Sequence, residues 1–378
     1  MNMTASLPTK KINIGVVGAT GVVGETFLSL IDERTFPAGE IRLFASEASV
    51  GLTRKCLGQD WAVQTLTEGC FEGLDLVFFS SGEEISEVWA PKAVEAGAFA
   101  VDNSSAFRMN DKFPLVVPEV NGDLLDRLLE QRLMPNGRAT IIANPNCSTI
   151  QLVVALNPLQ KTFGLKHVRV ASYQSVSGAG RNGIEELFSA TREALEGNEM
   201  TPVTFSAPIA FNCIPQIGGL SDDGFSSEET KIMNESQKIL RLPNLPVSAF
   251  TVRVPTMNSH AEVAWVTLNS DTISQQQIED ALQSQDGLEL GAPSFEQVES
   301  PAPNAISRSI DSAAHLKTYP LQVNVSGRDP VYVGRVHRDR AEKATWLMWI
   351  VSDNLRKGAA LNGIQIAERI FDLRRVAC

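Results

Sequence analysis

The sequence lacks long apolar runs and is poor in cysteine. No run reaches the roughly 18 apolar residues of a membrane-spanning helix, and the N-terminal MNMTASLPTKK lacks the apolar segment of a secretory signal. The five cysteines show neither metal-ligand spacing nor the density of a disulfide framework; they are Cys56, Cys70, Cys147, Cys213 and Cys378. We therefore expect a cytoplasmic protein of a reducing compartment, without a bound metal.

Positive charge is in the minority. Lys and Arg number 33 against 44 Asp and Glu, and the formal net charge of −11 disfavours nucleic acid or an anionic membrane as the main partner. An anionic substrate would have to be met by local basic residues. The chain has 378 residues, of which 43% are hydrophobic, and exceeds the roughly 250–300 residues that one core supports, so we expect two domains.

In the first 146 residues, short apolar runs alternate with helical patterns. The runs are typical of buried parallel strands and cover residues 12–17, 41–46, 74–80, 99–105 and 140–144. Amphipathic stretches at 25–31 and 85–97 are typical of helices. This alternation predicts an α/β domain with a doubly wound, Rossmann-type sheet.

The pattern changes after residue 147. Strands are predicted at 167–176, 247–256, 260–268, 321–327, 331–337 and 345–353, and helices at 182–195, 227–240 and 274–283. This favours an α+β domain with a mixed sheet and helices on one face. Residues 357–373 read as one amphipathic helix that returns to the first domain. We therefore expect domains at 1–146 plus 357–378 and at 147–356.

Three glycines follow the first predicted strand. Gly18, Gly21 and Gly24 fit G-x-x-G-x-x-G between a strand and a helix, where glycines bring backbone N–H groups and the helix N-terminus against a pyrophosphate. In this context the motif favours dinucleotide binding over a purely structural turn. Glu47 would suit the ribose hydroxyls of NAD. A 2′-phosphate could instead be held by Ser46, Ser49, Arg54 and Lys55, so the cofactor stays open between NAD and NADP.

Cys147 follows the turn Asn144-Pro145-Asn146 and begins a helical pattern. The positive end of a helix dipole lowers the pKa of a thiol, and neighbouring N–H groups could stabilise an oxyanion. A buried cysteine is more often a small core residue, but the tight turn before this one favours a nucleophile.

A nucleophilic thiol needs a partner that handles protons. Of the four histidines, His260 begins a predicted strand seven residues after Arg253, while His337 lies among charges and His167 and His315 have no supporting context. A lone histidine is often structural, but an arginine in an apolar strand normally has an anionic partner.

Two basic residues could serve an anion. Lys231 lies three residues after Glu228 on one predicted helix face, although Ser226 and Glu229 already fit a structural capping box there. Arg108 follows a strand end, where α/β sheets bind ligands. Taken singly, either residue could be a solvated surface charge.

Together these segments resemble aspartate-β-semialdehyde dehydrogenase over nearly the whole chain. The resemblance rests on INIGVVGATGVVG, VDNSSAFR, PLVVPEVN, IIANPNCST, SYQSVSGAG, EETK, VRVPTMNSH and GAALNGIQIAE, in the family's order and spacing. It implies a Rossmann-type NADP-binding domain, an α+β catalytic and dimerisation domain, and a homodimer.

The resemblance also implies roles for single residues. Cys147 would be the nucleophile and His260 the acid/base, while Gln174 and Arg253 would orient the substrate, the arginine by a bidentate pair with its α-carboxylate. Arg108, Lys231 and Asn146 would bind phosphate, and Glu228 would contact the substrate nearby. The implied cofactor contacts are Gly18, Thr20, Gly21, Val22, Val23, Gly24, Ala48, Ser49, Ser177, Gly178 and Asn362.

The implied reaction is the NADPH-dependent conversion of L-aspartyl 4-phosphate to L-aspartate 4-semialdehyde and phosphate through a cysteine acyl-thioester, in lysine, methionine and threonine biosynthesis. Two departures from the family pattern concern the cofactor. Ala48 stands where an arginine usually contacts the NADP 2′-phosphate, which opens the way to NAD, and Glu83 replaces a glycine near the cofactor. A third is the segment QRLMPNGRAT, which is a few residues longer than usual.

Two other functions compete. N-acetyl-γ-glutamyl-phosphate reductase would share the fold type, the thiol chemistry and an acyl-phosphate substrate, but NPNCST and EETK favour the aspartyl enzyme. A catalytically silent dinucleotide-binding subunit would be expected to have lost site residues, and here they are all present.

Overall fold

The protein divides into two compact units. The structure, a computed structural model, describes residues 11–133, 138–293 and 319–373. One unit comprises Met1–Pro118, Gly122–Asn144 and Ala360–Cys378, and the other comprises Glu119–Asn121 and Pro145–Ala359. In the described ranges, no helix is long and apolar enough to cross a membrane.

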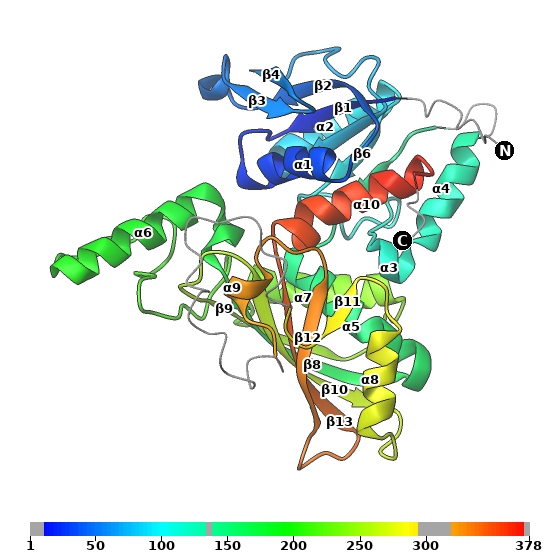
Figure 1. Cartoon of the computed structure of the whole chain (residues 1–378), viewed down its shortest axis with the longest axis vertical. Helices are drawn as coiled ribbons and strands as arrows, with labels where there is room; N and C mark the ends of the chain where they lie inside the picture. Colours follow the sequence, from blue (N-terminus) through cyan, green and yellow to red (C-terminus); the bar gives the residue numbers. More distant parts are fainter. Residues whose placement is uncertain (1–10, 134–137, 294–318, 374–378) are drawn as a thin grey trace, which may run out of the picture. The chain divides into compact units, whose positions relative to one another are not determined.

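The first unit contains a seven-stranded sheet of order β3-β4-β2-β1-β5-β6-β7 (Figure 1). Its strands are β1 (Ile12–Val17), β2 (Ala38–Phe44), β3 (Thr53–Cys56), β4 (Gln59–Gln64), β5 (Leu76–Phe79), β6 (Phe99–Asp102) and β7 (Ile141–Ala143). All neighbouring strands are parallel except β3 and β4. Because the order reverses beside β1, the predicted doubly wound sheet is confirmed, with its switch point at the glycine turn.

Helices cover both faces of this sheet. They are α1 (Val22–Glu33), α2 (Glu83–Glu95), α4 (Asp123–Leu133) and α10 (Leu361–Ile370), and the short α3 (Pro118–Asn121) crosses the unit boundary. Successive side chains of β5 enter opposite cores. Phe78 stacks on Phe27 of α1, with ring centroids 4.1 Å apart, in the core that α10 also fills, and Phe79 packs in the core that holds α2. The helix near the C-terminus therefore belongs to the first unit, as predicted.

The second unit contains a six-stranded mixed sheet of order β11-β12-β13-β10-β8-β9. Its strands are β8 (Leu165–Gln174), β9 (Val247–Arg253), β10 (His260–Leu268), β11 (Leu288–Leu290), β12 (Val331–Arg338) and β13 (Thr345–Ser352). The pairs β8–β9 and β11–β12 are parallel, and the others are antiparallel. The mixed sheet predicted from the alternating patterns is confirmed.

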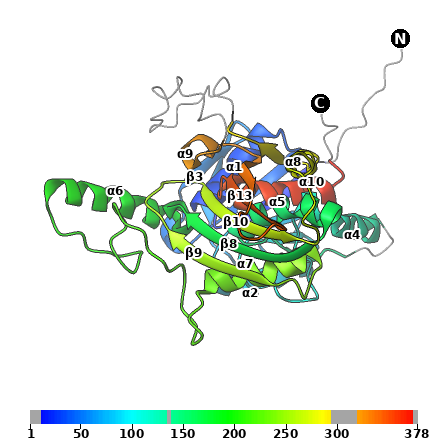
Figure 2. The same ribbon diagram turned by 90° about the horizontal axis from the view of Figure 1, so that it is seen from below.

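Helices α5 (Cys147–Phe163), α7 (Ser227–Leu240) and α8 (Gln275–Gln283) pack on this sheet, and α6 (Gly180–Glu196) extends away from it (Figures 1 and 2). The alternate residues Val168, Val170 and Ser172 of β8 are buried, as expected for one covered face. Val325 of the short α9 (Gln322–Val325) packs with Tyr173 and Trp349. These two side chains alternate with the covered positions, so a helix also lies on the second face.

The structure corrects two predictions. Residues 321–327 do not form a strand: Gln322 opens α9, and its Nε2 donates to the carbonyl oxygens of Tyr173 and Ser259, which fixes the turn. The last helix begins at Leu361 and not at residue 357, because Arg356–Ala360 form a π-helical turn. The strands β3, β4 and β11 were not predicted.

Candidate active site

The glycine turn between β1 and α1 has the geometry of an anion site. Gly18 has a φ of 82°, in the left-handed region, and a Cβ there would lie 2.8 Å from the Ser80 carbonyl oxygen. A Cβ at Gly24 would overlap the Gly18 carbonyl oxygen, so this glycine lets α1 start close to the turn. Gly21 is the N-cap of α1, and no side chain caps its first turn. This cradle fits a dinucleotide pyrophosphate.

The other cofactor residues expected near this turn lie on two segments. Val22 and Val23 open α1, and the Thr20 Oγ1 lies 3.4 Å from the Ser49 Oγ, which follows β2. Ala48 is exposed in the 3₁₀ turn Glu47–Ser49. The turn after β2 is therefore joined to the glycine turn by a contact between two hydroxyl groups.

Arg54, a candidate for a 2′-phosphate, already has an ionic partner. Its Nη2 lies 3.0 Å from the Glu25 Oε1 on α1, and its Nη1 donates to the Thr53 carbonyl oxygen. Lys55 and Ser46 are exposed. The Arg54 guanidinium is thus engaged by α1.

Asn362 and Arg108 are both buried within the first unit. The Asn362 Nδ2 donates to the Val116 carbonyl oxygen at 2.9 Å and to the Asn144 Oδ1 at 2.7 Å, which ties α10 to the end of β7. Arg108 is 7% exposed, and its Nη2 donates to the Asn103 carbonyl oxygen at 2.8 Å. Both side chains are held in defined positions by these contacts.

Cys147 is the first residue of α5 and is partly exposed. The N-cap is Asn146, whose Oδ1 accepts from the N–H groups of Ser148 at 3.0 Å and Thr149 at 3.1 Å. The helix N-terminus favours the thiolate of Cys147. The N–H groups of Ser148 and Thr149 are therefore occupied by the Asn146 side chain.

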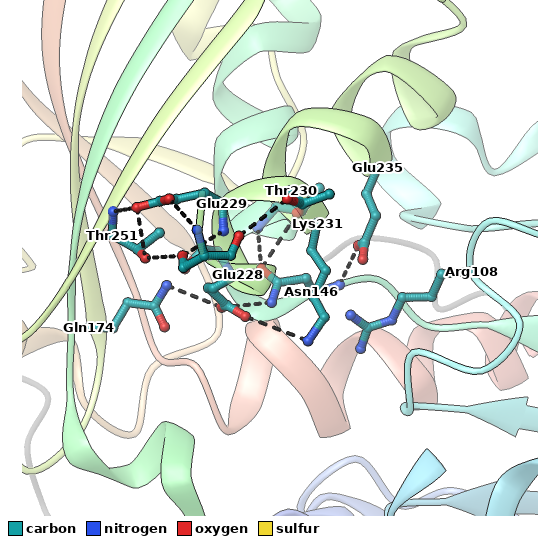
Figure 3. Close-up of polar contacts among 12 residues, drawn as sticks. Arg108, Asn146, Gln174, Glu228, Glu229, Thr230, Lys231, Glu235 and Thr251 are labelled. Carbon is teal, nitrogen blue, oxygen red and sulfur yellow. Dashed lines mark hydrogen bonds and ion pairs between the residues drawn. The ribbon is translucent and has the colours of Figure 1, made fainter. Parts of the chain in front are cut away.

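Glu228 on α7 joins several of the expected site residues (Figure 3). Its Oε1 accepts from the Asn146 Nδ2 at 2.8 Å and the Gln174 Nε2 at 3.2 Å. Its Oε2 lies 3.9 Å from the Lys231 Nζ, three residues along the helix. The Asn146 N–H donates to the Glu235 Oε2 at 2.7 Å. The turn before the thiol is therefore anchored to α7 by two carboxylates, and the predicted capping box of α7 is also present.

His260 opens β10 and is fully buried. Its Nδ1 accepts from the Ser175 N–H at 3.1 Å and lies 3.1 Å from the Ser175 Oγ. Among the residues that the structure describes, its Nε2 has no hydrogen-bond partner. Burial and then the positive charge of Arg253 lower the pKa of His260 to about 3, against a smaller opposing effect of a hydrogen bond between the ring and the Ser259 backbone, which raises it. The imidazole is therefore neutral near pH 7.

Arg253 ends β9 and is 7% exposed. Its Nη1 donates to the Ser175 carbonyl oxygen at 2.7 Å, so one residue holds both this guanidinium and the His260 ring. Burial lowers the pKa of Arg253, whereas the charges of Glu228 and Cys147 raise it. The anionic partners expected for this arginine are thus Glu228 and the thiolate.

The expected cofactor residues Ser177 and Gly178 lie beside this pair. A Cβ at Gly178 would lie 2.8 Å from the Arg253 Nη1 and 3.2 Å from the His260 Nε2. Ser177 is 2% exposed and donates to the Asn258 Oδ1 at 3.0 Å. The absence of a side chain at Gly178 therefore leaves space beside the Arg253 guanidinium and the His260 ring.

Asn354, which the sequence did not single out, connects the segments around His260. Its Oδ1 accepts from the Ser175 hydroxyl at 3.1 Å and from the Ser259 N–H at 2.9 Å, and its Nδ2 donates to the Ser177 Oγ at 3.0 Å. It is 3% exposed. The only signal in the sequence was the polar pair Asp353-Asn354 after an apolar strand, and its partners lie more than 90 residues away.

The π-helical turn Arg356–Ala360 passes close to Cys147. A Cβ at Gly358 would lie 3.0 Å from the Cys147 Cβ and 3.4 Å from the Asn354 Cβ. A larger residue here would push on the start of α5. The π turn therefore lets the chain pass close to the thiol, as such turns often do at functional sites.

Glu262 is a fully buried acid on the same strand as His260. Burial raises its pKa well above the ordinary value, and the charge of Glu228 acts in the same direction, while Gln151 opposes the rise. Glu262 is therefore a carboxylic acid whose ionisation is strongly disfavoured.

The other cysteines do not lie in a comparable setting. Burial and the nearby Asp32 raise the pKa of Cys56 to about 12, which makes its thiol unreactive, and burial also raises the pKa of Cys70. Cys213 is exposed. Cys378 lies outside the described residues.

The remaining sequence candidates lie at the surface or outside the described residues. His337 is exposed, and His315 falls within 294–318. Glu83 is the exposed first residue of α2, where the helix dipole favours a carboxylate. The segment QRLMPNGRAT falls partly within 134–137. Over the described part of the chain, no group of three or more His, Cys, Asp and Glu could hold a metal ion.

Comparison with known proteins places both units in one family. Residues 13–128 match the family model of the semialdehyde dehydrogenase NAD binding domain, and residues 156–357 match that of the semialdehyde dehydrogenase dimerisation domain. The first unit thus carries a domain that binds a nicotinamide dinucleotide.

Several relatives are similar over almost their full length. Aspartate-semialdehyde dehydrogenase 2 of Vibrio cholerae is 41% identical over 95% of this chain and 98% of the relative, and aspartate-semialdehyde dehydrogenase of Bacillus subtilis is 38% identical over 97% and 99%. The crystal structure of aspartate semialdehyde dehydrogenase II of Vibrio cholerae complexed with ASA matches with a TM-score of 0.84 at 40% identity, over 96% of this chain and 99% of that chain. The chain therefore belongs to the aspartate-semialdehyde dehydrogenase family.

Proposed function

We propose that this protein is an NADPH-dependent dehydrogenase that converts L-aspartyl 4-phosphate to L-aspartate 4-semialdehyde and phosphate. The observation that carries the proposal is that Cys147 begins α5, while Ser175 holds both the buried Arg253 guanidinium and the buried His260 ring. A nucleophile at a helix N-terminus, a neutral histidine and a carboxylate receptor are the groups that this reaction needs. The full-length relatives named for it support the same proposal.

The proposed residue roles divide the substrate between two anion sites. The Arg253 guanidinium binds the α-carboxylate, and Gln174 orients the carbon that Cys147 attacks. The thiolate forms a C–S bond as the C–O bond to phosphate breaks, which leaves an acyl-thioester. When bound, the reduced nicotinamide supplies the hydride that reduces this thioester. Lys231 receives the phosphate that leaves as the thioester forms, before its reduction, and Glu228 keeps the lysine in position.

The other proposed phosphate ligands are Arg108 and Asn146. Asn146 uses its Oδ1 as the cap of α5 and its Nδ2 toward Glu228, so its contribution is to hold the turn before the thiol. In the proposed division of labour, residues 147–356 carry the catalysis, and residues 1–146 with 357–378 carry the cofactor. The reducing conditions of the cytoplasm, the proposed compartment, would keep the Cys147 thiol free.

For the cofactor we propose NADP with a relaxed preference. The pyrophosphate would bind at Gly18, Gly21 and Gly24, and Ser49 would meet the ribose phosphate. Ala48 supplies no charge to the 2′-phosphate, which lowers the advantage of NADP over NAD. The contacts of Thr20, Val22, Val23, Ser177, Gly178 and Asn362 with the cofactor belong to the same proposal.

We also propose a homodimer that forms through the less covered face of the six-stranded sheet. Phe250, 54% exposed, points to this face together with Trp265. A hollow of about 410 Å³ lies between them and is lined also by Ala171, Arg169 and Glu342. Exposed aromatic residues on a sheet face mark protein interfaces, and the match to a dimerisation domain supports this choice.

The test is the formation of reduced nicotinamide by purified protein supplied with aspartate semialdehyde. NADP and NAD are compared, each with and without phosphate. We expect phosphate-dependent reduction that Cys147→Ala abolishes and that Cys213→Ala, at an exposed thiol, leaves unchanged. Folded wild-type protein without any signal would refute the activity and favour N-acetyl-γ-glutamyl-phosphate reductase or a silent subunit. Lys231→Ala should raise the KM for phosphate more than the KM for the semialdehyde.

A further inference from the structure

The contact between Ser175 and His260 fixes where the imidazole carries its proton. A backbone N–H can only donate, and the Ser175 N–H is directed at Nδ1 over an N···N distance of 3.1 Å. Nδ1 must therefore present its lone pair, and the single proton of the neutral ring lies on Nε2. We infer that His260 works as a neutral imidazole with its proton held on Nε2, and that Ser175 and Asn354 are positioning residues that keep it there.

Asn354 holds Ser175 from the other side. The Ser175 hydroxyl lies 3.1 Å from the Asn354 Oδ1, and the Asn354 Nδ2 donates to the Ser177 Oγ at 3.0 Å. The N–H groups of Val176 and Ser177 bind the carbonyl oxygens of residues 256 and 257, so the segment that carries the Ser175 N–H is bound along its length. The amide that faces Nδ1 therefore has little freedom to turn away.

Asn354 also holds the residue that precedes the imidazole. Ser259 has a φ of 68°, a left-handed conformation that is strained in a residue other than glycine. Its N–H donates to the Asn354 Oδ1 at 2.9 Å, and its carbonyl oxygen accepts from the Gln322 Nε2 at 2.7 Å. Strain of this kind persists only where neighbours over-determine it, and here they fix the start of the strand that carries His260.

The environment of the ring opposes a second proton. Burial and the Arg253 guanidinium keep the pKa of His260 low, and protonation of Nδ1 would break the hydrogen bond from the Ser175 N–H. Charged and titratable groups on the elements around the ring include Arg253 on β9, Cys147 on α5, Glu262 on β10, Glu228 on α7 and Asp353 after β13, and β8 adds His167, Arg169 and Tyr173. Asp353 is itself bound by the backbone N–H groups of Gly327, Leu355 and Arg356, so it does not supply a proton acceptor to the imidazole.

This inference rests on the proposed function and assigns the histidine a narrower task than acid/base catalysis. When hydride adds to the carbon of the Cys147 thioester, the electron pair of the C=O bond moves to oxygen. The C–S bond then breaks, the carbonyl reforms, and the thiolate returns. These steps leave no proton on His260. A donor to the developing oxyanion is sufficient, and the His260 Nε2–H can provide it in place of the capped N–H groups of Ser148 and Thr149.

The tautomer can be observed directly in the intact protein. Protein labelled with ¹⁵N-histidine gives only four sets of ring signals in a long-range ¹H–¹⁵N correlation spectrum, because the chain has four histidines. His260→Gln identifies the signals of His260, and His337→Gln, at an exposed position, is the matched control. We expect a neutral ring with the proton on Nε2 that does not change between about pH 6 and pH 8.

Variants then test the positioning residues. Ser175→Ala keeps the backbone N–H, so the Nε2–H tautomer should persist. Asn354→Ala frees both Ser175 and Ser259, and we expect mixed tautomer signals. In this variant kcat should fall about tenfold to a hundredfold, as for a small displacement of a catalytic group, while the KM for aspartate semialdehyde stays within about twofold.

The outcomes test the tautomer, the role of Asn354 and the proposed function separately. A proton on Nδ1 or a doubly protonated ring in wild-type protein would overturn the tautomer. Unchanged His260 signals and unchanged kcat in a folded Asn354→Ala variant would remove Asn354 as a positioning residue. If the Nε2–H signals are present but wild-type protein does not turn over aspartate semialdehyde, the tautomer stands and the proposed function fails.

Discussion

Replacing His260 with glutamine should make the folded protein less sensitive to acid. Burial and the charge of Arg253 lower the pKa of His260 from 6.5 to about 3, and each unit of such a shift corresponds to about 1.4 kcal/mol. The unfolded chain takes up a proton at this histidine below its ordinary pKa, whereas the folded protein does not until the pH approaches the lowered value. The stability that the neutral ring contributes is therefore present above pH 6.5 and lost as the pH falls.

The full loss approaches about 5 kcal/mol at low pH, and about 3 kcal/mol of it falls between about pH 7.5 and pH 4.5. Guanidinium unfolding followed by tryptophan fluorescence, at one protein concentration, would measure the pH dependence. Wild-type protein should lose about 3 kcal/mol more over this interval than His260→Gln does. His337→Gln should follow the wild-type curve. Equal pH dependence in wild type and His260→Gln would refute the claim that the folded protein holds His260 neutral.

Three further predictions concern two buried sites in the second unit, Gly178 and Glu262, and the exposed Phe250. Gly178→Ala would bring a Cβ within 2.8 Å of the Arg253 Nη1 and 3.2 Å of the His260 Nε2, so kcat/KM for aspartate semialdehyde should fall by at least about tenfold. Burial raises the pKa of Glu262, so its stabilising effect is present at low pH and lost as the pH rises; Glu262→Gln should increasingly stabilise the fold above about pH 4.5 in denaturant titrations. Phe250→Asp should shift the sedimenting species from dimer to monomer in analytical ultracentrifugation.

Each of these predictions has a control. Gly219→Ala adds a Cβ in open space and should leave kcat/KM unchanged; equal losses in both glycine variants would contradict the steric argument. A stability difference between Glu262→Gln and wild type that does not change with pH would show that the carboxyl is not perturbed. Val88→Asp, exposed on α2 of the first unit, tests whether any added charge dissociates the dimer, and a dimeric Phe250→Asp variant would remove this face as the interface.

Helices and strands could be predicted from apolar periodicity where the apolar residues of the pattern are also the ones buried in the fold. The bounds of β1, α7 and β10 were predicted to the residue, because their apolar periods match one structure only. Residues 321–327 were predicted to be a strand because their apolar residues alternate. The structure has a short helix there, and the Gln322 Nε2 donates to three acceptors that hold it. The hairpin β3–β4 was missed because its residues are largely polar and Leu57-Gly58 is not a usual turn pair.

Candidate site residues could be predicted from the sequence where the residue type itself suggests chemistry, as for a cysteine or a histidine. Residues that matter only through long-range hydrogen bonds could not. Cys147 and His260 stand out by residue type and by their place at the start of a helix and a strand. Asn354 has no such signature, since its importance depends on hydrogen bonds to Ser175 and Ser259, which are 179 and 95 residues away. The sequence did not indicate that the Asn146 side chain would cap the N–H groups of Ser148 and Thr149, because that cap depends on the geometry of the turn that positions the thiol.

The position of α10 has a consequence for synthesis of the chain. Ala360, Leu361, Ile364, Ile366, Ala367 and Ile370 fill the same core as β1 and α1, yet they come after the whole second unit in the sequence. On the ribosome, a domain usually folds as its residues emerge. Here the unit that begins first must wait for residue 370 to complete its core, while the second unit has all its residues by 359. The nascent seven-stranded sheet would therefore expose an apolar surface throughout the synthesis of the second unit.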